Sequence, residues 1–110
     1  MIQDTLSKLE QRLQQAETLP PETRASLETL VAELREEIAG LSGDQPHAME
    51  SIAGFTESST REALRPMQDP ELLDVSLEGL RRSVREFELS YPKLTEVVNG
   101  ICHQLSSLGI

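Results

Sequence analysis

The clearest structural pattern in the chain lies in residues 73–108, LDVSLEGLRRSVREFELSYPKLTEVVNGICHQLSSL. Apolar residues recur in it at alternating spacings of four and three, which place them on one side of an α-helix. Pro92 divides the pattern into two stripes, and a proline between two amphipathic helices is typical of the corner of an antiparallel helical hairpin. The first stripe comprises Leu73, Leu77, Leu80, Val84, Phe87 and Tyr91, and the second comprises Leu94, Val98, Ile101, Leu105 and Leu108.

The first 43 residues predict another helical hairpin. An apolar stripe over residues 2–16 indicates one helix, and the run LPP at 19–21 ends it because proline cannot continue a helix. Proline is well tolerated in the first turn of the next helix, which should run from residue 21 to residue 39 or 41. Gly40 or Gly43 is expected to cap that helix in a left-handed conformation.

A third helix is expected after the turn at Gly43, with Asp44 as its N-cap. Gly54 and the run SST at 58–60 lower its intrinsic helix propensity, so this helix should be frayed or bent. Its inward face comprises Met49, Ile52, Ala53, Thr56, Ser59 and Ala63.

The fourth helix should begin at Asp69-Pro70-Glu71, where an aspartate can act as the N-cap and a proline fits the first turn. We expect it to extend to about residue 90, and the fifth helix to run from 92 to 108 with Gly109 as a left-handed cap. The sequence therefore predicts an all-α fold of about five helices, arranged as antiparallel helical hairpins in a bundle with coiled-coil-like packing. The expected organisation is a single domain, with an N-terminal hairpin over 1–43, a bundle core over 44–110 and, within it, a C-terminal hairpin over 69–110.

The size of the core favours association. With 110 residues and 3% aromatic residues, burial must come mainly from Leu, Ile and Val. Each fully buried side chain of this kind contributes about 1.5–3 kcal/mol, whereas ordering a residue costs about 1.5 kcal/mol. An oligomer would help to offset the cost of ordering the chain, so we expect a homo-oligomer and favour a dimer.

The charge balance excludes several classes of partner. The chain has 19 acidic and 10 basic residues, a formal net charge of -9, and no segment with a positive balance. Direct nucleic-acid binding needs a dense positive face, and docking on an anionic membrane needs basic residues, so neither is expected. The sequence shows neither a signal peptide nor a membrane span, and its one cysteine, Cys102, agrees with a reducing compartment. A cytoplasmic protein is expected.

No catalytic, cofactor or metal site is predicted. His47 and Glu50 have the spacing of a metal-ligand pair on a helix, but a complete site needs three or four converging ligands. Cys102 and His103 are adjacent, so on a helix they point about 100° apart, which is poor geometry for a nucleophile and its base. Cys102 is better explained as a small buried hydrophobic residue. We therefore expect a protein that is not an enzyme.

Two features of the fourth helix are candidates for contacts with other helices or partners. Leu72, Ser76, Gly79 and Ser83 form a stripe of mostly small residues, which either permits close approach of another helix or tolerates Gly79 at a cost near 1 kcal/mol. Arg81, Arg82 and Arg85 form the one basic cluster along the sequence. Pairing within the helix, with Glu78 and Glu88, is the simpler interpretation. Docking of an acidic partner is the alternative.

Several segments carry a resemblance to a known family: MIQDTL at 1–6, LPPE at 19–22, ESIAGF at 50–55, SLEGL at 76–80, SVREFE at 83–88 and LGI at 108–110. Over its whole length the chain resembles a small family of helical proteins of Gram-negative bacteria, one of the domain-of-unknown-function families. The resemblance implies a short stand-alone protein and supplies no activity and no functional residues. Some members are labelled chromosome-partitioning proteins of the ATPase type, but this chain lacks the phosphate-binding loop pattern G-x-x-x-x-G-K-[ST].

Three hypotheses of function follow. The leading one is a non-enzymatic, self-associating helical module that acts by binding another protein. The second is an accessory factor in chromosome or plasmid partitioning that works through a protein partner. The third is a carrier of a small ligand or metal in the interior of the helical bundle.

Overall fold

The computed structural model describes residues 2–41 and 45–108. Over these ranges the regular elements are the α-helices α1 (Ile2–Gln15), α2 (Pro21–Ala39), α3 (Pro46–Ala63), α4 (Pro70–Val84) and α5 (Pro92–Leu108), with a 3₁₀ turn, η1 (Arg85–Phe87), after α4. No strand occurs in the part of the chain that is described, and the predicted all-α fold is confirmed. None of the described helices is both long enough and apolar enough to cross a membrane. The caps predicted at Gly43, Asp44 and Gly109 lie outside the described residues.

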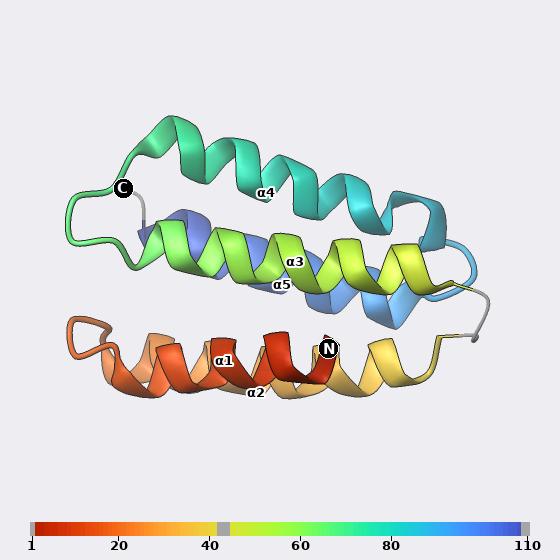
Figure 1. Ribbon diagram of the computed structural model, residues 1–110, viewed down its shortest axis with the longest axis horizontal. Coiled ribbons are helices and arrows are strands. Elements are labelled where there is room, and N and C mark those ends of the chain that lie inside the picture. The colour runs from red at the N-terminus through yellow and green to blue at the C-terminus, as the bar shows by residue number, and fades with distance from the viewer. Residues whose placement is uncertain (1, 42–44, 109–110) are drawn as a thin grey trace.

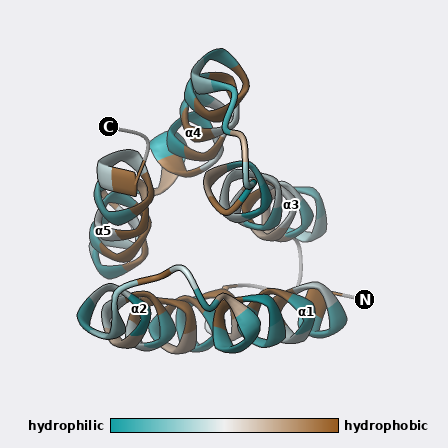
Figure 2. Cartoon of the chain, turned by 90° about the vertical axis from the view of Figure 1, so that its left-hand side faces the viewer, coloured by the Kyte–Doolittle hydropathy of each residue, from teal (hydrophilic) through white to brown (hydrophobic). Residues whose placement is uncertain are grey.

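The helices lie in layers, with their axes close to the long direction of a molecule that measures 38 × 25 × 22 Å (Figure 1). Viewed end-on, α1 and α2 lie side by side, α3 and α5 cover them, and α4 lies above α3 and α5 (Figure 2). Helix α3 contacts α1, α4 and α5, and α5 contacts α2, α3 and α4. The two central helices, α3 and α5, therefore join the α1–α2 layer to α4.

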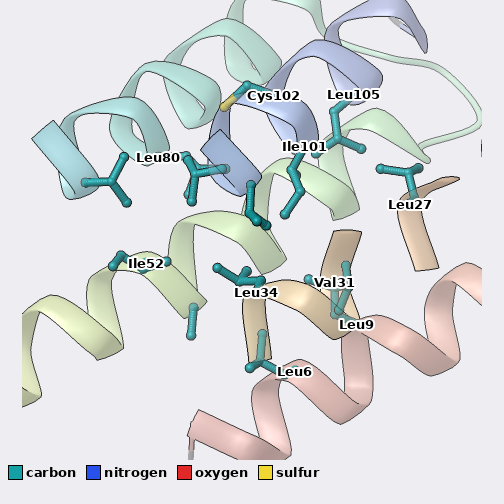
Figure 3. Packing of buried hydrophobic residues seen from close by; sticks show 14 of the residues in the cluster. Leu6, Leu9, Leu27, Val31, Leu34, Ile52, Leu80, Ile101, Cys102 and Leu105 are labelled. Carbon is teal, nitrogen blue, oxygen red and sulfur yellow. The ribbon is translucent and has the colours of Figure 1, made fainter. Parts of the chain in front are cut away.

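All five helices contribute to one buried apolar cluster (Figure 3). The two stripes that flank Pro92 lie in it as predicted, except that Tyr91 and Leu108 are half-buried at its edge. The side chains with less than 2% exposure include the following: Leu6, Leu9, Leu13, Leu27, Leu34, Ile38, Ile52, Leu77, Leu80, Leu94, Ile101 and Leu105.

Helix α3 is continuous over Pro46–Ala63, so the fraying expected at Gly54 and at residues 58–60 is not found. Its buried face carries three small polar side chains, Thr56, Ser59 and Thr60, each at most 2% exposed. The two threonine hydroxyls donate to the carbonyl oxygens of Ile52 (2.7 Å) and Thr56 (2.8 Å) within the same helix. Because these hydroxyls are satisfied by the helix itself, they can be buried without disrupting it.

Two predicted helix ends differ from the structure. Gly40 caps α2 with φ −82° and ψ −7°, a right-handed conformation, so the left-handed cap predicted there is wrong. The α-helix of α4 ends at Val84, not near residue 90, and η1 follows it. Pro92 disfavours helical geometry at the residue before it, and the Phe87 and Tyr91 rings pack edge-to-face at 5.8 Å. The tighter 3₁₀ turn lets the chain reverse within this corner.

The start of α4 agrees with the sequence. The carboxylate Oδ1 of Asp69 accepts hydrogen bonds from the backbone N–H groups of Glu71 (3.1 Å) and Leu72 (3.3 Å), and Pro70 occupies the first turn. The predicted N-cap is confirmed. It fixes where α4 begins and therefore which of its residues face α3.

Candidate functional site

The residues considered for chemistry are dispersed. Cys102 is 2% exposed on the side of α5 that faces α4 (Figure 3), and burial raises the pKa of its thiol above the ordinary value. His103 is exposed beside it, and His47 and Glu50 are exposed in the first turns of α3. Within residues 2–41 and 45–108, no three His, Cys, Asp or Glu side chains gather as a metal site would require.

The arginines of α4 lie on its exposed side. Glu78 accepts a hydrogen bond from Arg82 Nε (3.0 Å) and lies 3.8 Å from Arg81 Nη1. The hydrogen bond from Arg82 is the main cause of a lowered pKa at Glu78, and the charges of Arg81 and Arg85 add to it. The side chains of Arg81, Arg82 and Glu78 are 45 to 69% exposed, so such pairs stabilise the helix only slightly.

The stripe of small residues on α4 lies against α3. A Cβ atom built at Gly79 would be 2.6 Å from Cδ1 and 2.9 Å from Cζ of Phe55, with Cε1 closer still. The Phe55 ring therefore occupies the space that any other residue at position 79 would need. Ser76 and Ser83, which flank Gly79 on this stripe, are half-buried. The close approach predicted at Gly79 is therefore made by Phe55, a residue of the same chain.

An exposed apolar surface begins at this contact. Phe55 is 39% exposed, and on α4 Leu72 is 45% and Val75 is 69% exposed. Val75 precedes Gly79 by one helical turn and Leu72 by two, so both lie along the same side of α4 as the Phe55 ring. We call Phe55, Leu72 and Val75 the α3–α4 apolar face. Large apolar side chains gathered on one face mark an interaction surface more often than scattered ones do.

The stripe also borders a cavity at the end of the molecule where α3 begins. Its volume is about 340 Å³, and it is lined by the first turns of α3, the last turn of α4 and η1, including His47, Ser51, Arg82, Ser83 and Glu86. Basic, acidic and hydroxyl groups are mixed in this lining. The cavity therefore has no clear preference for ligand charge.

The structure brings together a second group of arginines that the sequence did not indicate. Arg12 from α1 and Arg61 and Arg65 from the end of α3 line one cavity of about 310 Å³. Along the chain, Arg12 is about fifty residues away from Arg61 and Arg65. Arg12 and Arg61 each lie in the last turn of their helix, which is the signal available in the sequence. The sequence does not reveal that α1 and α3 end side by side.

Comparison with protein-family models, with curated proteins and with solved structures finds no match for this chain. The resemblance stated from the sequence motifs therefore stays a prediction. What the protein does must be argued from its own surfaces.

Proposed function

We propose that the protein is a non-enzymatic helical interaction module that associates with a second copy of itself through the α3–α4 apolar face. The observation that carries the proposal is the exposure of Phe55, Leu72 and Val75 on one side of a molecule whose other large apolar side chains are mostly buried. Helix α4 is packed on one side, against α3 and α5, and its outer side is available to a partner.

The energy available from this face is modest. Covering the exposed parts of the three side chains would contribute about 3 kcal/mol per copy. Association costs at least about 4 kcal/mol in lost translational and rotational freedom. With both copies counted, the apolar contact leaves about 2 kcal/mol, so charge pairs across the interface are needed to bring the dissociation constant of a reversible dimer to the order of 1 mM. A protein partner could bind the same face with higher affinity if it supplied more apolar surface.

The charges on α4 favour a second copy as the occupant. Glu71, Glu78 and Arg82 are spaced with Val75 at intervals of four, three and four, so these charged residues lie on one side of α4 along with the Val75 edge of the apolar face. Two α4 helices packed antiparallel about a two-fold axis would place Glu71 of each copy opposite Arg82 of the other. Each such pair would contribute about 0.2–1 kcal/mol. The net charge of -9 opposes this only weakly, because charges beyond about 8 Å are screened at physiological salt.

We further propose that the helices pack as antiparallel hairpins and that the protein acts in the cytoplasm. Support for the first comes from the contacts between consecutive helices, α1 with α2, α3 with α4 and α4 with α5. Support for the second is the single cysteine, which is typical of proteins in reducing compartments.

The test is a substitution at the most exposed residue of the face. Val75→Glu should weaken association at least tenfold, because it puts a carboxylate into the apolar contact. Leu89→Glu is the matched control, since Leu89 is 97% exposed in the corner between α4 and α5. Average mass should be followed by sedimentation equilibrium up to about 1 mM protein. Equal association of both variants and the unmodified chain would reject the proposed interface.

A further inference from the structure

We propose that the cavity between the ends of α1 and α3 is a binding site for a small anion that carries a phosphate or carboxylate group next to a short apolar portion. The site is formed by Arg12, Arg61 and Arg65, and it is separate from the α3–α4 apolar face. The inference does not depend on the proposed self-association.

The lining of the cavity has two chemically distinct parts. One part is the three arginines together with Gln15, and the other is apolar, formed by Ala16, Leu64 and Pro66. The arginine side chains are 43 to 49% exposed, so their guanidinium groups remain accessible from the cavity. A guanidinium group offers planar pairs of N–H donors that match a phosphate or carboxylate.

The glutamates nearby leave the arginines incompletely neutralised. Glu57 forms ion pairs with two of them, because its carboxylate oxygens lie 3.6 Å from Arg12 Nη2 and 3.3 Å from Arg61 Nη1. Arg65 Nη1 lies 3.2 Å from Glu62 Oε1, but outside hydrogen-bond geometry, so this buried oxygen has no hydrogen-bond partner. Three guanidinium groups therefore face two carboxylates. The described residues that line the cavity include these three arginines and no acidic residue, in a protein whose net charge is -9.

Helix dipoles explain part of this arrangement, since Arg12 and Arg61 lie near helix C-termini, where positive charge is favoured. They do not explain why side chains from two helices converge on one cavity. Arg65 follows the end of α3 and still lines the same space, beside the apolar wall formed by Leu64 and Pro66. An anion with an apolar substituent would satisfy both parts of the lining at once.

The size of the cavity limits the ligand. A volume of about 310 Å³ is at the small end of ligand pockets and corresponds to about ten water molecules. Phenyl phosphate, with its dianionic group and one ring, is a suitable probe. Benzoate tests whether a carboxylate replaces the phosphate, inorganic phosphate tests the need for the apolar part, and benzyl alcohol tests the need for charge.

The experiment is an NMR titration of the full chain that follows the side-chain Nε–Hε signals of the arginines. Phenyl phosphate should shift the signals of Arg12, Arg61 and Arg65, with a dissociation constant on the order of 1 mM. Binding should weaken at least tenfold in the variant Arg12→Gln/Arg65→Gln. Arg85→Gln, at the opposite end of the molecule, is the matched control and should bind as the unmodified chain does.

A conservative variant keeps the test independent of folding. Arg65→Lys keeps the charge but not the paired donors, so it should bind phenyl phosphate more weakly while its thermal melting temperature stays unchanged. Comparable binding of benzyl alcohol would overturn the requirement for an anion. If inorganic phosphate bound as tightly as phenyl phosphate, the requirement for an apolar portion of the ligand would be overturned. Shifts confined to the Nε–Hε signals of Arg81, Arg82 and Arg85, or no shifts at Arg12, Arg61 and Arg65, would overturn the site itself.

Discussion

At the scale of single residues, burial decides the chemistry of the one cysteine. Cys102 has the residue type of a nucleophile, but its side chain is 2% exposed and lies among apolar neighbours. Removing the thiol from water disfavours the charged thiolate and raises its pKa. The sequence predicted a buried hydrophobic role from its position one step away from the stripe of α5, and the observed burial confirms that position.

This pKa has a consequence for stability at alkaline pH. At pH values below the pKa of the thiol in the unfolded chain, near 9.0, the thiol is protonated in both the folded and the unfolded state. It then makes stability neither rise nor fall with pH. As the pH rises above that value, the unfolded chain loses the proton first. The free energy of unfolding should then fall, by up to about 1.4 kcal/mol per pH unit, until the folded-state pKa is reached. Urea titrations from pH 8 to about 10 should show this slope reduced in Cys102→Ala, and equal slopes in the two proteins would contradict it.

At the scale of elements, the absence of a side chain at Gly79 lets the Phe55 ring of α3 pack closely against α4. The spacing of the stripe on α4 was visible in the sequence, but its neighbour was not. A periodic pattern identifies which face of a helix is special, whereas the partner that covers it depends on tertiary arrangement. For the same reason, the stripes flanking Pro92 were predicted residue by residue, while the arginine cavity was missed.

The contact between Gly79 and Phe55 predicts different outcomes for two glycines in helix interiors. Gly54 has open space where its Cβ would lie, so Gly54→Ala should stabilise the protein by about 0.5 to 1 kcal/mol. Gly79→Ala has the same gain in helix propensity but must displace the Phe55 ring, so it should be about 1 to 2 kcal/mol less stable than Gly54→Ala.

Urea unfolding of the two variants measures this difference. Removal of the ring provides the control, because Gly79→Ala should become as stabilising as Gly54→Ala in a Phe55→Ala background. If the two glycine variants have equal stability in the unmodified background, the close contact is not energetically significant.

At the scale of the whole molecule, the layers leave two surfaces at different places. The α3–α4 apolar face extends over α3 and α4, and α4 is the helix that lies farthest from α1 and α2 (Figure 2). The arginine cavity lies at one end, where α1 and α3 finish. The all-α class and the main helix bounds could be predicted because they follow from local periodicity and proline placement. The grouping of Arg12 with Arg61 and Arg65 could not, because it depends on which helices become neighbours.

The proposed dimer through α4 can be tested by a charge-reversal cycle at Glu71 and Arg82. Glu71→Arg and Arg82→Glu should each weaken the dimer several-fold, because each variant places like charges opposite one another across the two-fold axis. The combined variant restores opposite charges and should recover most of the association of the unmodified chain. The measurement is the average mass by sedimentation equilibrium at about 1 mM protein. A mass of 12.2 kDa for the unmodified chain, or a combined variant no better than the two single variants, would contradict the account.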